Sequence, residues 1–588
     1  MRKLSCGALR RSDAGERVEL NGWVNRRRDH GALVFIDLRD RDGLTQIVIH
    51  PEQQQAFEIA QALRSEDVVR VHGTARVRPA GTENAKLPTG EVELEVESLE
   101  LLARSLVPPF PVASDGEVDE ALRMTYRYLD LRRPRLQHNL TVRHKIVKAM
   151  RDFFDERDFL EIETPCLIKS TPEGARDYLV PSRIDPGSFY ALPQSPQLLK
   201  QILMIGGIGR YMQIARCFRD EDLRADRQPE FTQLDVELSF VDEEDVMALM
   251  EDCIAYVWHK ALGREIERPI PRLTHAQSLA RYGNDKPDLR FGLELVDVAE
   301  AFAGTQIKFL QEHAASDASR IVAVRYPGGA ALSRRDFDEL TETAKSFGAS
   351  GLIWLALTDG GWKSSIQKLL DDATVARLRE TSGAVEGDAL LLVAGTKAAA
   401  TDVAGRLRLH VGERLRLRDP EKFAFCWVVG FPLFELDPDT GRIGPTHHAF
   451  TAPAAGQEQL IERDPLAVRA QHYDLVLNGF ELGSGSVRIH DPVLQRKVFE
   501  IAGLSEEQVQ ERFGFFVQAL QYGAPPHGGM AWGLDRLVML ACGETNIRDV
   551  IAFPKNQLAR DLMMDAPAAV PPEALAELGL QARAKPVR

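Results

Sequence analysis

The sequence predicts a multidomain α+β protein, and three observations carry this expectation. The chain has 588 residues, whereas a single domain usually runs to about 100 to 200 residues. Its first hundred residues alternate short β-type runs with turn signals, and the following part mixes helical and strand patterns. Between about 287 and 415 the composition shifts toward Ala, Gly, Ser and Thr. This shift indicates a domain inserted into another.

Composition excludes several classes of protein. Hydrophobic residues make up 44% and charged residues 27% of the chain, as in folded soluble domains, so a large core is available. No run of about 18 apolar residues is present, and the N-terminus lacks the apolar stretch of a signal peptide. The six cysteines lie far apart without a CxxC pair. We therefore expect a protein of the reducing cytoplasm that neither is secreted nor spans a membrane.

The net charge of −14 argues against a general electrostatic binder of nucleic acids. The charge is uneven, because residues 1–104 are nearly balanced and the remainder carries the acidic excess. Any contact with a nucleic acid should therefore be local.

The first domain is expected over residues 1–104. Its β-type runs fall at 18–25, 33–38, 44–50, 68–77 and 92–101, with a helical stretch at 52–63 after the third run. Five strands with one helix in this position suit an OB-fold, and a generic β-barrel is the alternative.

The remaining boundaries follow from shifts in pattern. Residues 105–134 form a linker or hinge that contains the rigid PPFP segment. A mixed domain has its first part at 135–286, with a helix at 135–157 and strands at 159–165, 210–218 and 231–239. The α+β insertion, 287–415, contains an expected helix at 363–379 and strand at 389–394. Strands at 425–434 and 474–489 begin the second part of the interrupted domain, 416–565, and an Ala/Pro-rich tail covers 566–588.

Three stretches of the interrupted domain carry chemical signal: FLEIETPCL at 159–167, CFRDEDLRADRQPEFTQLDVELSF at 217–240 and PPHGGMAWGLDRLVML at 525–540. Taken singly, the first reads as a strand edge and the second as a solvated hairpin tip. However, Arg219 follows a strand end, from which its planar fork can hold a phosphate in two-pronged geometry. No P-loop and no GxGxxG is present, so an ATP site would be of another kind.

Together and in this order, the three stretches resemble the signature motifs of class II aminoacyl-tRNA synthetases. With the barrel in front, the chain is similar to the aspartate, asparagine and lysine subgroup, and with the large insertion it resembles the bacterial aspartyl-tRNA synthetases. The resemblance covers about residues 2–565. It implies a homodimer whose interface is built by the first motif, and an ATP-dependent ligase that attaches L-aspartate to tRNA through an adenylate.

The resemblance also implies roles in ATP binding and catalysis. Arg219 would hold the α-phosphate, Glu221 would orient the adenine and Arg536 would hold the γ-phosphate, so positioning and charge neutralisation replace a protein nucleophile. The ATP site would comprise Arg219, Asp220, Glu221, Gln228, Glu481, Gly533, Leu534, Asp535 and Arg536. Mg²⁺ requires hard oxygen ligands, which Asp474 and Glu481 would supply, whereas no zinc is expected because no Cys or His set has ligand spacing.

An aspartate side chain is small and anionic, so its pocket needs cations and fixed donors. By resemblance, Lys200 and Arg488 form the aspartate-binding pair, with Arg488 making a bidentate contact. The remaining aspartate-binding residues would be Glu173, Ser195, Gln197, Arg219, Gln233, Asp235, His447 and His448. Without the resemblance, the two histidines would be read as a metal-free packing pair.

For tRNA, Arg26, Arg27 and Arg28 would contact phosphates, and Phe35 would stack an unpaired base. By resemblance Phe35 and Gln46 recognise anticodon bases, while His30 and Gly81 are typical of family members that accept both tRNA(Asp) and tRNA(Asn). We expect charging of both tRNAs, with strict tRNA(Asp) specificity as the alternative.

Three further alternatives are disfavoured. A tRNA-independent ATP-dependent ligase of the same catalytic fold would lack the barrel. A regulatory RNA-binding paralogue would have lost Arg219, Arg536 or the aspartate pair. A lysine-specific enzyme would need an acid in place of Arg488.

Overall fold

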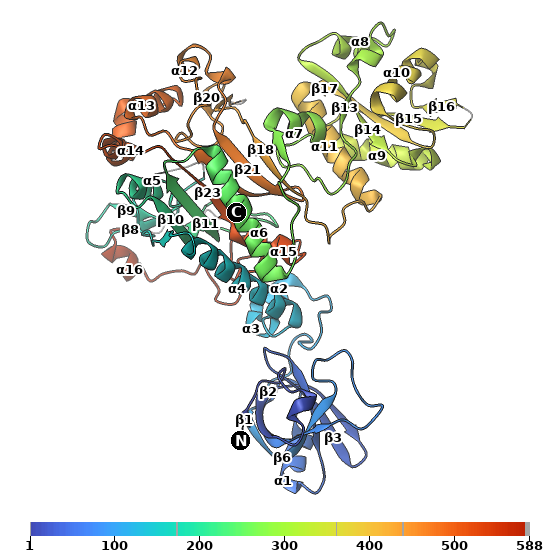
Figure 1. Cartoon of the computed structure of the whole chain (residues 1–588), viewed down its shortest axis with the longest axis vertical. Coiled ribbons are helices and arrows are strands. Elements are labelled where there is room, and N and C mark those ends of the chain that lie inside the picture. The colour runs from blue at the N-terminus through green and yellow to red at the C-terminus, as the bar shows by residue number, and fades with distance from the viewer. Residues whose placement is uncertain (1, 172–174, 360, 438–439, 582–588) are drawn as a thin grey trace. The chain divides into compact units, whose positions relative to one another are not determined.

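The computed structural model describes residues 2–171, 175–359, 361–437 and 440–581 (Figure 1). Its internal contacts divide the described chain into two units. The first unit holds residues 2–144, 223–228 and 546–570, and the second holds 145–222, 229–545 and 571–581. None of the described helices combines the length and the apolar composition needed to span a membrane.

The first unit begins with a closed β-barrel. Its strands are hydrogen-bonded in the order β1-β2-β3-β4-β6-β5, and β2 also pairs with β5, which closes the sheet. The elements are β1 (Arg2–Lys3), η1 (Arg11–Asp13), β2 (Arg17–His30), β3 (Leu33–Arg39), β4 (Leu44–Ile49), α1 (Gln54–Ala62), β5 (Val68–Val77) and β6 (Val92–Ala103). The five expected strands, and the helix after the third of them, are therefore confirmed.

Alternation along β3 shows why this segment forms a barrel wall. Val34, Ile36 and Leu38 are buried in the barrel core, while Phe35 and Asp37 lie on the opposite side and are half-buried. Since successive side chains of a strand point to opposite faces, one strand supplies both core and outer surface. The outer side chains are therefore available for recognition.

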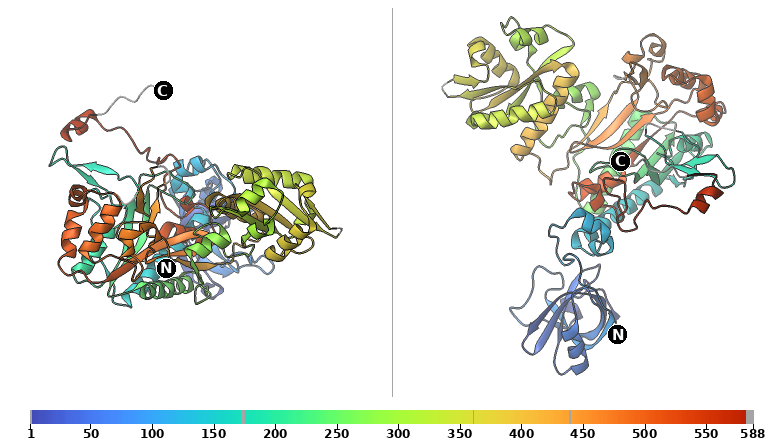
Figure 2. Two further views of the ribbon diagram at one scale, coloured as in Figure 1. Left: turned by 90° about the horizontal axis from the view of Figure 1, so that it is seen from above. Right: turned by 180° about the vertical axis from the view of Figure 1, so that it is seen from behind.

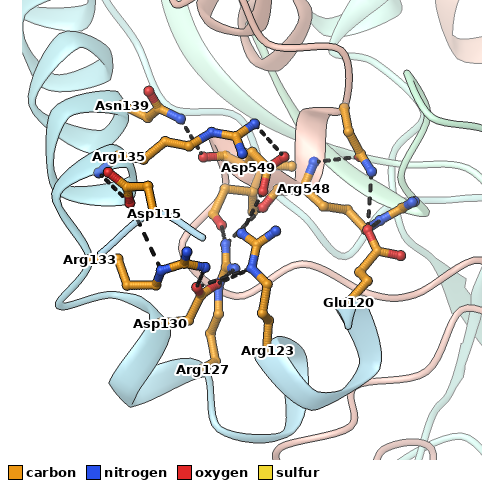
Figure 3. Close-up of polar contacts among 12 residues, drawn as sticks. Asp115, Glu120, Arg123, Arg127, Asp130, Arg133, Arg135, Asn139, Arg548 and Asp549 are labelled. Carbon is orange, nitrogen blue, oxygen red and sulfur yellow. Dashed lines mark hydrogen bonds and ion pairs between the residues drawn. The ribbon is translucent and has the colours of Figure 1, made fainter. Parts of the chain in front are cut away.

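A cluster of arginines and carboxylates ties the segment after the barrel to residues near 548 (Figure 3). The helices here are α2 (Glu120–Thr125), α3 (Arg127–Asp130), η6 (Ile547–Asp549) and the start of α4 (Pro134–Asp155). Asp130 is fully buried and accepts hydrogen bonds from Arg123 Nε at 3.1 Å and Arg127 Nη1 at 2.6 Å. Arg123 Nη2 also donates to Asp549 at 2.7 Å, so one guanidinium joins two segments more than 400 residues apart in sequence.

The second unit contains an eight-stranded sheet in the order β12-β18-β21-β22-β23-β11-β10-β7. Its strands pair antiparallel except for β7 with β10 and β12 with β18. They are β7 (Leu160–Glu161), β10 (Arg210–Phe218), β11 (Glu230–Ser239), β12 (Arg272–Thr274), β18 (Phe425–Val429), β21 (His472–Leu477), β22 (Phe480–Val487) and β23 (His527–Gly533). The expected strand at 474–489 is thus two strands, because Asn478 and Gly479 adopt positive φ and turn the chain.

One face of this sheet is apolar and covered by α6 (Glu243–Leu262), whose Met250, Ile254 and Trp258 are fully buried. Tyr473 belongs to this face, and the opposite face carries its neighbours His472 and Asp474. Further elements of the unit are β8 (Leu179–Pro181), β9 (Phe189–Ala191), α5 (Gln197–Ile205), α7 (His275–Tyr282), β19 (Phe434–Leu436), β20 (Ile443–Pro445), α12 (Leu460–Arg463), η5 (Pro465–Ala467), α13 (Pro492–Ile501), α14 (Glu506–Leu520), α15 (Leu534–Ala541) and α16 (Pro572–Glu577).

A separate five-stranded sheet, in the order β13-β14-β17-β15-β16, has helices on both faces (Figures 1 and 2). Helices α9 and α11 share one hydrophobic core with it, and α8 and α10 share the other. The elements are β13 (Val296–Asp297), η2 (Ala299–Phe302), α8 (Lys308–Ala314), β14 (Ser319–Tyr326), η3 (Gly329–Ala331), α9 (Arg334–Ser346), β15 (Ile353–Thr358), β16 (Gly361–Ser364), η4 (Gln367–Leu369), α10 (Asp372–Ser382), β17 (Ala389–Thr396) and α11 (Lys397–Arg414). All lie within the compositionally distinct region.

The helix expected at 363–379 is wrong in its first half. Residues up to Ser364 form β16, which pairs with β15 through Trp362 opposite Leu357. Helix α10 begins only after Asp371, whose carboxylate accepts a hydrogen bond from the Thr374 N–H at 2.7 Å. Sheet pairing therefore overrides local helix propensity before the N-cap.

Candidate functional site

The register of the eight-stranded sheet assembles a polar face. Cα partners on neighbouring antiparallel strands point the same way. One row across the sheet is His472, Ser486, Gly529, Glu237 and Tyr211, and the next is Asp474, Ser484, Ala531, Asp235 and Gln213. The acidic and hydroxyl side chains thus flank small residues on the central strand β23.

Gly529 is required by its neighbours. A Cβ atom built on it would lie 2.1 Å from the Glu237 Oε2 atom and 2.1 Å from the carbonyl oxygen of Val236. Only glycine allows β23 to pass this close to β11 while the Glu237 carboxylate lies across it. The second glycine of the third motif therefore makes room for a buried carboxylate.

That carboxylate belongs to a buried ion cluster. Arg488 Nε and Nη2 donate to the two Glu237 oxygens at 2.9 and 3.1 Å. Lys200 Nζ donates to Asp235 Oδ1 at 3.0 Å and lies 3.3 Å from Glu237 Oε2. The four side chains are at most 2% exposed. Two cations and two anions thus form a desolvated set whose formal charges cancel.

Glu237 and Asp235 differ in the direction of their pKa shifts and in their hydrogen-bond partners. Burial opposes ionisation of Glu237, but Arg488 and Lys200 outweigh it and hold the pKa of this carboxyl below its usual value. Burial raises the pKa of Asp235. Among the described residues, the buried Asp235 Oδ2 and Gln197 Nε2 atoms have no hydrogen-bond partner. The Asp235 Oδ2 atom can accept a hydrogen bond from an ammonium, and the Gln197 Nε2 atom can donate one to a carboxylate.

Arg488 differs from expectation in one respect. Its Nε and Nη2 edge already holds Glu237, and Nη1 donates to Ser486 Oγ at 2.7 Å and lies 3.2 Å from His448 Nε2. A substrate carboxylate would therefore meet the outer edge formed by Nη1 and Nη2. Burial lowers the pKa of His448 and Arg488 adds to the effect, so this ring is neutral.

The ring of His447 is held by two aromatic neighbours. It stacks on His472 with centroids 3.7 Å apart and a 7° interplanar angle, and it meets Phe431 edge-on at 5.0 Å. Burial lowers the pKa of His447 to about 4, with His472 as a further cause. The ring therefore stays neutral at physiological pH.

The second motif presents Arg219 directly after β10. Its N–H donates to the Pro229 carbonyl at 2.9 Å, and its guanidinium lies 5.1 Å from the centre of the Phe231 ring. The Arg219 Nε atom is buried without a partner among the described residues. An aromatic face beside a guanidinium whose Nε is not engaged by a described residue suits a purine nucleotide and its phosphate. The neighbouring Asp220 pairs with Arg176, at 3.7 Å.

The third motif places its residues in different ways. Arg536 is half-buried and donates to the Glu481 carbonyl, while Asp535 Oδ2 accepts from the Thr232 N–H at 2.8 Å and so anchors α15 to β11. Leu534 is in the core, and Gly533 is the N-cap of α15. Of these four, only the Arg536 side chain suits a phosphate.

Asp474 and Glu481 lie on neighbouring strands and fit a hard cation. Burial raises the pKa of Asp474 to about 6, and burial together with Asp474 raises the pKa of Glu481. A divalent cation between two such carboxylates offsets their mutual repulsion and stabilises the ionised form of both. Across the described part of the chain no set of three or more His, Cys, Asp or Glu side chains gathers as a metal site. Mg²⁺ held by two carboxylates would therefore need phosphate and water oxygens as well.

The remaining residues predicted for the ATP and aspartate sites have other surroundings than the buried ion cluster. Both amide atoms of Gln228 bond to the Lys555 backbone, at 2.8 Å each, within the first unit, so the structure does not group it with the sheet residues. Ser195 Oγ accepts from the Gln197 N–H at 3.2 Å, at the start of α5. Gln233 contacts the Cys217 sulfur at 3.2 Å. Glu173 lies outside the described residues.

The barrel carries a second polar surface. Arg28 Nη2 donates to Asp37 at 2.7 Å and to Gln46 at 3.1 Å, and Gln46 Nε2 donates to Glu93 at 2.7 Å. Beside them, Phe35 meets His30 edge-on at 5.7 Å. Arg26 and Gly81 are exposed.

The structure engages Arg27 in contacts within the barrel domain, and its expected contact with a phosphate stays a prediction. Its guanidinium donates to the carbonyls of Ala60, Gln61 and Leu63 at the end of α1. Alternation along β2 turns it away from its neighbours, and a cation is favourable at a helix C-terminus.

Sequence reasoning missed Glu237, Ser486, His472 and Glu93. For Glu237 a signal existed, because it stands two residues after Asp235 in the otherwise apolar strand LDVEL and so shares its face. For the other three residues, the neighbouring side chains become known only from the pairing of the strands.

Comparisons with known proteins agree with this picture. Residues 119–557 match the family model of tRNA synthetases class II (D, K and N), and residues 18–102 match that of the OB-fold nucleic acid binding domain. The chain is 52% identical to the aspartate–tRNA(Asp/Asn) ligase of Moorella thermoacetica, covering 99% of this chain and 97% of that protein. The ligase of the same name from Heliobacterium modesticaldum is 50% identical, with 98% and 95% covered.

Solved structures show the same fold at lower identity. Asparaginyl-tRNA synthetase from Pyrococcus horikoshii, solved with asparaginyl-adenylate, has a TM-score of 0.59 and 19% identity, and the match covers 94% of this chain and 98% of that chain. A putative aspartyl-tRNA synthetase from Leishmania major Friedlin has a TM-score of 0.59 and 19% identity, with 94% of each chain covered.

Proposed function

The chain belongs to the tRNA synthetases of class II (D, K and N), and on this premise we propose that it attaches L-aspartate to tRNA at the expense of ATP. It is an aspartate–tRNA ligase that forms aspartyl-adenylate and diphosphate, and then aspartyl-tRNA and AMP. The curated relatives at about 50% identity over nearly the whole chain bear this name.

The observation that carries the amino-acid specificity is the buried cluster of Lys200, Arg488, Asp235 and Glu237. Its outer Arg488 edge and Lys200 favour a side-chain carboxylate, and the unpartnered Asp235 oxygen suits the α-ammonium. An asparagine amide would turn N–H groups toward buried cations, which is unfavourable. Gln197, Ser195, Gln233, His447, His448 and Glu173 complete the proposed aspartate site.

The chain's residues act by orientation and charge. Arg219 holds the α-phosphate and Arg536 the γ-phosphate, which exposes the α-phosphorus to in-line attack by the aspartate α-carboxylate while diphosphate leaves. Phe231 offers a stacking surface for adenine, and Glu221, Asp220, Gln228 and the backbone of 533–535 are the further ATP contacts. Asp474 and Glu481 would hold Mg²⁺, which when bound neutralises phosphate charge.

In the second step, the terminal ribose hydroxyl of the tRNA attacks the adenylate carbonyl carbon, and AMP leaves. The barrel would bind the anticodon, with Phe35 stacking a base, Gln46 reading a base edge and Arg26 and Arg28 near phosphates. Relatives named for both tRNA(Asp) and tRNA(Asn) support dual charging here. His30 ends β2, and Gly81 has open space where a side chain would be, so neither residue would penalise the third anticodon base of tRNA(Asn).

We further propose a homodimer that works in the cytoplasm. Leu160 and Leu167 of the first motif are 52% and 51% exposed, and Phe240 is 80% exposed, a set of apolar side chains suited to a subunit interface. The domain boundaries inferred from the sequence, including the linker at 105–134 and the tail at 566–588, belong to the same proposal.

The test is exchange of radioactive diphosphate into ATP by the purified enzyme, with each amino acid in turn. We expect exchange to depend on L-aspartate. With L-asparagine or L-lysine it should be at least about a hundredfold weaker. Equal exchange with asparagine would reject the assignment of the pocket, and none with any amino acid would reject the activity.

A further inference from the structure

His472 is a buried histidine to which neither the motifs nor the proposed reaction assigns a role. It is 1% exposed and lies at the start of β21, in the same row of the sheet as Ser486 and Glu237. Its ring stacks on His447 at 3.7 Å and 7°, and Phe431 meets it edge-on at 4.9 Å. Its Nε2 atom lies 3.0 Å from Asp474 Oδ1 and 3.1 Å from Ser484 Oγ. One ring thus touches both a histidine and a carboxylate of the polar face.

These contacts define which nitrogen carries the proton. A neutral imidazole has one N–H. Because an ionised carboxylate only accepts hydrogen bonds, the proton belongs on Nε2, which donates to Asp474. The Nδ1 atom is then a bare acceptor, in agreement with its having no partner among the described residues. The Ser484 hydroxyl also donates to Asp474, so His472 and Ser484 both hold this carboxylate.

The two partners of His472 serve different parts of the proposed site. His447 belongs to the aspartate pocket, and Asp474 belongs to the pair that would hold Mg²⁺. Part of the His447 residue is exposed, and its ring is held in place by stacking on His472 together with the edge-on contact of Phe431. Groups that contact ligands need neighbours that fix their orientation, and such neighbours affect affinity without touching the ligand.

We propose that His472 is a positioning residue, which fixes the His447 ring by stacking and the Asp474 carboxylate by a hydrogen bond. It holds the amino-acid pocket and the metal-binding carboxylates in one geometry. The inference rests on the proposed function of the same site.

Two substitutions separate the two contacts. His472→Phe keeps an aromatic ring against His447 but removes the donor to Asp474. His472→Gln keeps an amide donor at about the reach of Nε2 but removes the ring. His410→Gln, on α11 of the five-stranded sheet, is the matched control for loss of a half-buried histidine outside the site.

Two binding measurements on the full-length enzyme read out the contacts. L-aspartate affinity is measured by calorimetry without ATP or metal, and Mn²⁺ affinity by electron paramagnetic resonance with α,β-methylene-ATP. His472→Phe should weaken Mn²⁺ binding at least about tenfold and leave aspartate within about twofold. His472→Gln should weaken aspartate binding about fivefold, the size of a lost aromatic pair, and leave Mn²⁺ within about twofold. The control should change neither.

Equal losses of both affinities in both variants, or no loss in either, would overturn the proposal. Should the variants fail to fold, a crystal structure of the wild-type enzyme with L-aspartate decides. Continued stacking on His447 and contact with Asp474 are expected, and a ring turned away from either contradicts the proposal. Wild-type exchange is measured first, so absence of aspartate-dependent activity there would reject the proposed function rather than the role of His472.

Discussion

Replacement of Arg488 by leucine tests the ion cluster most sharply. The substitution removes the fork on Glu237, at 2.9 and 3.1 Å, and the bond to Ser486, at 2.7 Å. Glu237 is fully buried, and the ion-pair partner that remains to it among the described residues is Lys200, at 3.3 Å. Breaking one side of a buried ion pair costs about 3–5 kcal/mol of folding free energy, because the remaining charge stays desolvated. The unfolding free energy in urea should fall by that amount.

Substrate binding should suffer separately from stability. A hydrogen bond to a charged group contributes about 1.5–3 kcal/mol, so KM for aspartate should rise by roughly 10- to 150-fold at 25 °C. KM for ATP should stay within about twofold, because Arg219, directly after β10, and Arg536, on α15, belong to other segments than Arg488. Diphosphate exchange at varied aspartate and ATP concentrations measures both constants.

A double substitution distinguishes the two effects. When Arg488→Leu is combined with Glu237→Gln, no buried carboxylate is left without its arginine partner. Most of the lost stability should therefore return, while KM for aspartate stays high. If the double variant recovered aspartate binding together with stability, Arg488 would have only a structural role. Equal weakening of aspartate and ATP binding by the single change would also refute the assignment.

Three further predictions use other parts of the molecule. Deletion of residues 1–104 should spare aspartate-dependent exchange and abolish tRNA charging; equal loss of both activities would contradict the division of labour. Arg219→Lys should lower exchange about tenfold to a hundredfold, since lysine cannot reproduce the planar fork; unchanged exchange would remove Arg219 from the phosphate site. Burial lowers the pKa of His527 below its usual 6.5, so the unfolded chain binds its proton more readily and stability falls as pH drops below about 6.5. His527→Gln should flatten this fall in urea titrations at pH 7.5 and 5.5, and an unaltered slope would refute it.

The barrel and the position of Arg219 directly after a strand could be predicted because their signals are local. Strands such as Leu33–Arg39 alternate core and outer residues between turn signals. Arg219 stands at a strand end inside a motif, which fixes its position without knowledge of distant segments. Local pattern thus sufficed for the fold class and for part of the candidate site.

What could not be predicted depends on contacts between distant segments. Arg488 and Glu237 are 251 residues apart, and only the pairing of β22, β23 and β11 brings them together. His472 precedes Asp474 by two residues, but its stacking on His447 requires the tertiary structure. Residues 361–364 have helical neighbours in sequence and yet pair with β15. Similarly, Arg27 stands among basic residues but caps α1.

The central claim is that this enzyme charges tRNA with aspartate and accepts both tRNA(Asp) and tRNA(Asn). Its most direct test is aminoacylation of the two purified, unmixed tRNAs with radioactive L-aspartate under identical conditions. We expect aspartyl-tRNA from both, with kcat/KM values within about tenfold, a difference of roughly 1.4 kcal/mol. Charging of tRNA(Asn) below about a hundredth of tRNA(Asp) would contradict dual specificity, and failure to charge tRNA(Asp) with aspartate would contradict the whole account.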